Sequence, residues 1–107
     1  NDRLNQAARA KVMDMVEIGY WDHFRPGDGK TPWSFIREKG YAYRSAGENL
    51  ALGFSTTTEI TDAWLESPAH AANVLSSKYQ DVGFSSILVK DQDGKVVIMT
   101  VQMFGGK

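Results

Sequence analysis

Apolar residues recur with helical spacing over the first part of the chain. The members of this stripe are Leu4, Ala7, Ala8, Val12, Met15 and Val16. Positions separated by three or four residues lie on one face of an α-helix, so the stripe predicts an amphipathic helix over residues 2–18. Asp2 is the expected N-cap of this helix, and Gly19 is the expected stop.

A second, shorter helix is predicted after the loop at residues 25–29, which is rich in proline, glycine and aspartate. Thr31 is expected to cap this helix, Pro32 to fill its first position and Gly40 to follow its end. Trp33 and Ile36 are three residues apart, and we interpret both as core residues rather than ligand contacts.

A third helix is predicted from Ser55 to Glu66. Thr56 and Glu59 have the spacing of a capping box. Its buried face is expected to consist of Ile60, Ala63 and Trp64.

The dipeptide Ser67-Pro68 predicts the start of a fourth helix, with serine as N-cap and proline in the first position. His70, Asn73 and Val74 then share one face. His70 would lie in the first turn, where the helix dipole disfavours an imidazolium and leaves a neutral ring.

The last part of the chain predicts a β-hairpin. Residues 82–90 and 95–104 are two apolar runs, and residues 91–94 (DQDG) between them form a strong turn signal. Residues 96–101 are apolar on both faces of a strand, which is typical of a central strand covered by helices on both sides.

These elements predict an α+β fold in which a small antiparallel sheet, of about three strands, lies between helical layers. Residues 47–53 are expected to add a short strand or an irregular extended segment. The 107 residues, of which 42% are hydrophobic, are enough for one packed domain over residues 1–107.

The candidate chemistry centres on Glu48, an acid inside the otherwise apolar run at residues 46–53. A buried carboxylate is costly unless another group pairs with it. The chain has two histidines, His23 and His70. We therefore ask whether they converge on Glu48, or whether His23 is simply a loop histidine packed among aromatic residues.

Composition excludes several classes of function. The net charge is −1 and the twelve Lys and Arg residues are scattered, so no basic stripe indicates a nucleic-acid partner. The absence of cysteine excludes disulfides and a thiol nucleophile. No apolar run approaches the roughly 20 residues of a transmembrane helix.

Several motifs of the chain resemble the bacterial branch of the CAP superfamily, also called the SCP-like extracellular domain. Residues 47–51 (GENLA) look like its GEN[IL]A box, and residues 63–75 (AWLESPAHAANVL) look like its W-x-x-S-P-x-H-x-x-N-[IL]-L box. Residues 22–26 (DHFRP) match the segment that carries the family's first histidine. Residues 82–83 and 102–105 look like its closing strands.

The resemblance implies a secreted or cell-envelope protein with an α-β-α sandwich and a cleft lined by His23, Glu48 and His70. The eukaryotic branch has a further glutamate, at a position that is Ser67 here. Family members usually begin with an earlier helix of the N-x-x-R type, which the chain is expected to lack. The usual arginine after the second histidine is Ala71.

The same resemblance gives candidate ligands. Some members of the family bind a divalent metal in the cleft, and two imidazoles with one carboxylate suit zinc. His23, His70 and Glu48 are thus the candidate metal ligands, and Asn49, Asn73 and Gln102 are further candidate cleft residues. A small apolar ligand or a cell-wall component is the other expected partner.

Two alternatives remain open at this point. A metal-activated water, or a histidine base acting with Glu48, would make the same cleft a hydrolase site for esters or peptides. No G-x-S-x-G or H-E-x-x-H motif supports that reaction. In the other alternative the histidines and Glu48 are purely structural, and the domain is an interaction module.

Overall fold

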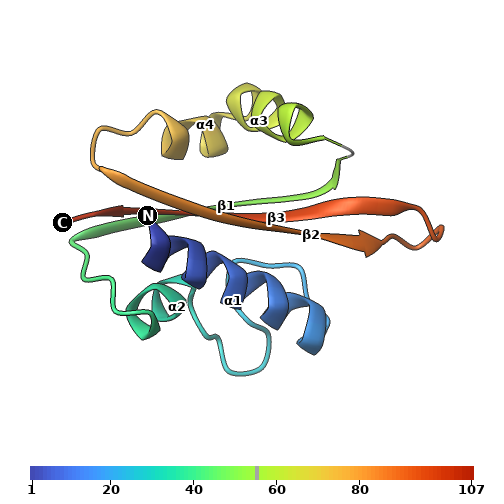
Figure 1. Cartoon of the computed structure of the whole chain (residues 1–107), viewed down its shortest axis with the longest axis horizontal. Helices are drawn as coiled ribbons and strands as arrows, with labels where there is room; N and C mark the ends of the chain where they lie inside the picture. Colours follow the sequence, from blue (N-terminus) through green and yellow to red (C-terminus); the bar gives the residue numbers. More distant parts are fainter. Residues whose placement is uncertain (55) are drawn as a thin grey trace.

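A computed structural model describes residues 1–54 and 56–107 of the chain. Three antiparallel strands form one sheet, and two helices cover each of its faces (Figure 1). The elements are α1 (Asp2–Ile18), α2 (Pro32–Glu38), β1 (Ser45–Phe54), α3 (Thr57–Glu66), α4 (Pro68–Val74), β2 (Asp81–Lys90) and β3 (Val96–Gly106). The predicted α-β-α sandwich is confirmed.

Helix α1 has the predicted span but a different cap. The side chain of Asn1, not that of Asp2, accepts a hydrogen bond from the backbone N–H of Leu4. Gly19 ends the helix in the left-handed conformation, with φ at 83°. Val16, which we predicted to be a member of the buried stripe, is exposed, so this stripe is narrower than predicted at the end of the helix.

The strand order is β1-β3-β2, which places β3 in the centre as the apolar run predicted. β3 pairs with β1 from Ser45↔Gly106 to Phe54↔Ile98, and with β2 from Asp81↔Gly105 to Lys90↔Val96. The stretch around Glu48 is therefore a ladder-forming edge strand, not an irregular segment. Its register shifts only near its end, between Leu52 and Phe54.

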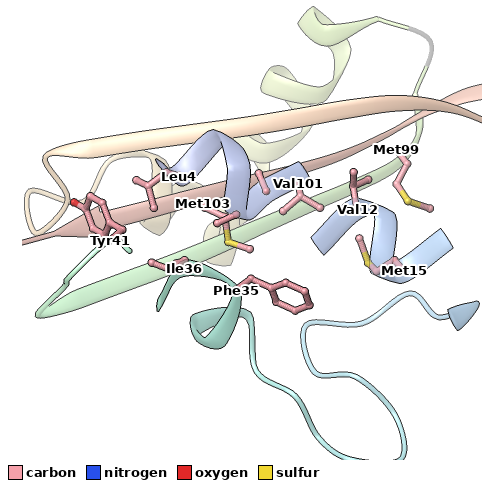
Figure 2. Close-up of a cluster of buried hydrophobic side chains, with 11 residues drawn as sticks. Leu4, Val12, Met15, Phe35, Ile36, Tyr41, Met99, Val101 and Met103 are labelled. Atoms are coloured by element: carbon pink, nitrogen blue, oxygen red, sulfur yellow. The ribbon is translucent and has the colours of Figure 1, made fainter. Parts of the chain in front are cut away.

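The larger core lies between the sheet and the layer of α1 and α2 (Figure 2). Val101 and Met103 of β3 point from the sheet toward this layer and are fully buried there. Helices α1 and α2 contribute most of the other buried side chains, which include Leu4, Val12, Met15, Phe35 and Ile36. Ile36 is thus a core residue as predicted, while Trp33 is only half-buried.

A smaller core lies on the other face of the sheet, where Ile60 and Trp64 of α3 pack against Ala51 of β1. The side chain of Thr56 caps α3 by accepting from the N–H of Glu59. The predicted helix start at Ser55 lies outside the described residues. Ser67 is the N-cap of α4, as predicted, but its side chain makes no capping hydrogen bond.

Glycine allows α1 to approach β2 closely. A Cβ added at Gly83 would overlap the backbone of Leu4 and Asn5. At the same contact the side chain of Asn5 accepts a hydrogen bond of 3.0 Å from the N–H of Phe84. Within the described residues, no helix is long and apolar enough to cross a membrane.

Candidate ligand-binding groove

Alternation along β1 sends Glu48 and Asn49 to opposite faces of the sheet. Glu48 points toward α1 and the loop after it, and Asn49 points toward α4. The predicted cleft residues therefore lie on both faces of the edge strand β1, Glu48 on one face and Asn49 on the other.

Glu48 and His23 form a direct pair. The Nδ1 atom of His23 lies 2.7 Å from Oε1 of Glu48, and the glutamate side chain is fully buried. The His23 side chain is 50% exposed, so one edge of its ring is open to solvent. The hypothesis that His23 meets Glu48 is supported by this geometry.

Lys11 of α1 is a third charged group at this position. Its side chain is fully buried, and its Nζ lies 3.7 Å from Oε2 of Glu48. The same ammonium donates a hydrogen bond to the backbone carbonyl of His23. Oε2 of Glu48 is buried and has no hydrogen-bond partner among the described residues, so the nearby ammonium is its principal stabilising contact.

Burial and charge act in opposite directions on these groups. Burial raises the pKa of Glu48, although His23 and Lys11 both act to lower it. Burial likewise lowers the pKa of Lys11, while Glu48 acts to raise it. The hydrogen bond to Glu48 raises the pKa of His23 above the ordinary histidine value.

On the other face, three amide side chains form a connected network. Nδ2 of Asn73 donates to Oδ1 of Asn49 at 2.9 Å and to the backbone carbonyl of Glu48 at 3.1 Å. Nδ2 of Asn49 lies 3.3 Å from both Oε1 of Gln102 and the backbone carbonyl of His70. Because these amides satisfy one another and the backbone, they join α4 to β1 and β3.

His70 reaches this region mainly through its backbone. Its ring Nδ1 lies 2.9 Å from Oγ of Ser67, which explains why that serine does not cap α4. The ring centroid lies 6.5 Å from that of Trp64. Its pKa is lowered first by burial and then by the charge of His23, and both effects favour the neutral ring that was expected here.

A groove of about 270 Å³ opens beside the pair of His23 and Glu48. Its other lining residues are Phe24, Trp33, Ala46, Gly47 and Asn73. The groove therefore combines aromatic side chains with an imidazole and an amide, which is the usual make-up of a small-molecule site. Of the candidate residues, it brings together His23, Glu48 and Asn73, while Asn49 and Gln102 lie behind it in the amide network.

Comparison with known proteins identifies the fold family. Residues 1–104 match CAP, the Cysteine-rich secretory protein family. The chain belongs to this family. A curated relative is the uncharacterized protein YkwD of Bacillus subtilis (strain 168), which is 36% identical over 83 residues. That match covers 78% of this chain and 32% of YkwD, so the chain spans about a third of the relative's length.

Two solved structures are similar to this CAP domain. An extracellular protein containing an SCP domain from Bacillus anthracis str. Ames has a TM-score of 0.79 at 25% identity, over 98% of this chain and 32% of that one. An outer surface protein from Borrelia burgdorferi has a TM-score of 0.78 at 23% identity, over 100% and 75% of the two chains. The second likeness concerns the fold alone.

The residues of the CAP domain fit a metal only in part. Within residues 1–54 and 56–107, no three His, Cys, Asp or Glu side chains form a metal-binding group. Both oxygens of Glu48 face protein cations or donors, Oε1 toward His23 and Oε2 toward Lys11. Each histidine, in contrast, still has one ring nitrogen that could bind a metal. Its Nδ1 is hydrogen-bonded to a protein oxygen, and its Nε2 makes no hydrogen bond with the described residues.

Sequence reasoning missed three residues of this region. Lys11 is the most informative, because it follows Leu4, Ala7 and Ala8 on the buried stripe of α1, and a lysine at such a position needs a buried partner. Phe24 and Trp33 line the groove, and our assignment of Trp33 to the core was incomplete. Their roles depend on how the loop between α1 and α2 folds, which no periodic pattern encodes.

Proposed function

We propose that this CAP domain binds a small ligand outside the cell, in the groove beside His23. The cellular location is supported by the family, whose name describes secretory proteins, and by the extracellular protein from Bacillus anthracis that shares the fold. The absence of a membrane-spanning helix among the described residues is compatible with either a secreted or an envelope-associated protein.

The observation that carries this proposal is the composition of the groove. Phe24 and Trp33 offer apolar surface. Beside it, His23 offers Nε2 and Asn73 offers its amide oxygen, since its Nδ2 already donates to Glu48 and Asn49. Such a site suits a ligand that has a compact apolar part next to a hydroxyl, amide or carboxylate group. Cell-wall fragments and small lipids both offer this combination.

The experiment is a titration of the ¹⁵N-labelled domain with two probes, soluble peptidoglycan fragments and a short-chain fatty acid, followed by NMR. We expect saturable shifts at residues 23, 24, 33, 46, 47 and 73 with one of the two probes. Phe24→Ala should weaken that binding about tenfold, because the loss of one aromatic contact costs on the order of 1.4 kcal/mol.

Leu88→Ala is the matched control, because Leu88 is also an exposed apolar side chain but lies on β2, at the opposite edge of the sheet. It should bind like the wild type. If neither probe produces saturable shifts at millimolar concentration, ligand binding in this groove is refuted for both classes.

Zinc binding is a second candidate, and one observation favours it. In His23 the Nδ1 atom is bound to Glu48, and in His70 it is bound to Ser67, which leaves Nε2 of each ring for a metal. A carboxylate behind a ligand histidine is a common arrangement in zinc proteins, because it fixes the tautomer and the ring orientation. In this proposal His23 and His70 are the ligands, and Glu48 orients His23 rather than touching the metal.

Isothermal titration calorimetry with zinc tests this candidate. We expect His23→Ala and His70→Ala each to abolish the binding heat, and Glu48→Gln to weaken binding by about 10- to 100-fold. Affinity should fall as the pH drops, beginning above about pH 6.5 where His23 takes up a proton, because protonated imidazole cannot bind a metal. No zinc heat in the micromolar range, together with a melting temperature unchanged by EDTA, would rule the metal out.

A further inference from the structure

Lys11 is a buried charged residue that the proposed function does not use. We propose that it is a positioning residue of the groove, which holds the loop that carries His23 against β1 from inside the protein. This inference rests on the proposed function, because it concerns how the binding surface is kept in place.

The ammonium of Lys11 contacts two parts of the same unit. It donates to the backbone carbonyl of His23, and it lies 3.7 Å from Oε2 of Glu48. Glu48 in turn accepts from Nδ1 of His23 through its other oxygen. Lys11, His23 and Glu48 thus form a closed ring of contacts that joins α1, the loop and β1.

The rest of the environment makes Lys11 a fixed group. Its side chain is fully buried, and its Nζ lies 5.5 Å and 5.6 Å from the ring centroids of Tyr20 and Phe35. The ammonium therefore lies close to two aromatic rings inside the protein. A confined donor restricts the position of the carbonyl that it binds more strictly than a mobile surface lysine would.

The loop itself has little burial to hold it. Trp21, His23 and Phe24 are all largely exposed. Its two ends are tied to Asp14 of α1, by the Tyr20 hydroxyl and by the Arg25 guanidinium at 3.0 Å. Between these two ties, Lys11 is the contact that fixes the backbone at His23, which is the residue that the groove needs in place.

A simpler role for Lys11 is to neutralise the buried charge of Glu48. Both roles predict that Lys11→Met, which keeps most of the apolar stem, lowers the melting temperature because it leaves Oε2 of the buried Glu48 carboxylate without a nearby cation. The double variant Lys11→Met/Glu48→Gln separates them. It removes both charges and keeps an amide oxygen that accepts from His23, but it lacks the donor to the His23 carbonyl.

The experiment compares amide hydrogen exchange in unliganded Glu48→Gln and in the double variant, with the wild type as reference. The two variants differ only at residue 11, where the double variant has methionine in place of the lysine that donates to the His23 carbonyl. We expect the double variant to regain most of the melting temperature lost in Lys11→Met. We also expect the amides of residues 21–24 to exchange at least tenfold faster in it than in Glu48→Gln, while the amides of β3 exchange at similar rates.

Equal exchange at residues 21–24 in these two variants would overturn the positioning role and leave Lys11 as a counter-charge only. Faster exchange spread evenly over β3 and the loop would overturn it too, because the effect would then be global. Since no ligand is present in these measurements, their outcome is independent of the titrations that test the proposed function.

Discussion

At the scale of single residues, the pKa values of the two histidines are shifted in opposite directions. The hydrogen bond to Glu48 raises the pKa of His23, whereas burial and the charge of His23 lower the pKa of His70. NMR titration of the two imidazole rings should therefore give one midpoint above about 6.5 and one below it. Glu48→Gln should move the His23 midpoint downward, and a titration in which the two curves coincide would contradict the assigned contacts.

These shifts also predict how stability varies with pH. His23 has a raised pKa in the folded protein, so its stabilising contribution is complete below about pH 6.5 and is lost as the pH rises through the folded value. His70 has a lowered pKa in the folded protein, so its protonation destabilises the fold at acidic pH, and this penalty disappears as the pH rises to about 6.5. In His23→Ala, the melting temperature should no longer fall as the pH rises above about 6.5. In His70→Ala, it should no longer rise as the pH increases toward about 6.5.

A residue of the site could be predicted from the sequence when its type was unusual for its position in the local pattern. An acid in an apolar run and two histidines are conspicuous, so the amino-acid sequence alone was enough to single out His23 and Glu48. Lys11 has the same kind of signal, a charge on an apolar stripe, but lysine is so common on helix surfaces that the signal was overlooked. The partner of Ser67 was not predictable, because a cap serine and a serine bound to His70 look identical in sequence.

At the scale of elements, the sequence predicted the helices and the hairpin, which local patterns define, more sharply than the strand β1. Periodicity and caps located α1, α2 and the hairpin of β2 and β3 to within about two residues. β1 was left open as a strand or an irregular segment, because its glycines weaken the strand pattern and its pairing with β3 is non-local. Whether such a segment forms a strand depends on a pairing partner that is distant in the sequence, and the local pattern holds no information about that partner.

The contact of α1 with β2 gives a test at this scale. Gly83→Ala should lower the free energy of unfolding by about 2–3 kcal/mol, because the added methyl overlaps the backbone of Leu4 and Asn5, which cannot move aside as a side chain would. Chemical denaturation measures the loss.

Gly19→Ala is the control, because its methyl would meet open space and only the left-handed backbone at φ 83° disfavours it. That strain costs about 1 kcal/mol. If the two alanine variants are equally stable, the close approach of α1 to Gly83 is not as tight as described.

At the scale of the whole molecule, the two faces of the sheet are unequally packed. Among the described residues, the layer of α1 and α2 shares the larger buried cluster with the sheet, and α3 contributes only Ile60 and Trp64 to the smaller one. Local opening is easiest where few apolar contacts must be broken. The α3 and α4 layer should therefore be the less stable half.

Native-state hydrogen exchange tests this expectation. Amides of Thr57–Glu66 and Pro68–Val74 should exchange through openings of lower free energy than those of Asp2–Ile18, and Trp64→Phe, which loses the hydrogen bond to the Leu50 carbonyl, should widen the gap. Equal protection of the two layers would mean that the sheet unfolds as one unit with all four helices.

The position of β3 has a consequence for the order in which the domain can fold. β3 is central in the sheet but follows both of its partners in the chain, so β1 and β2 have no strand to pair with until β3 has been synthesised. A nascent chain that does not yet include β3 cannot form the sheet, because, among the described residues, β1 and β2 each pair only with β3. If the domain is exported, as we propose, this order keeps β1 and β2 unpaired until β3 has been made, and an unpaired chain can still pass through a translocation pore.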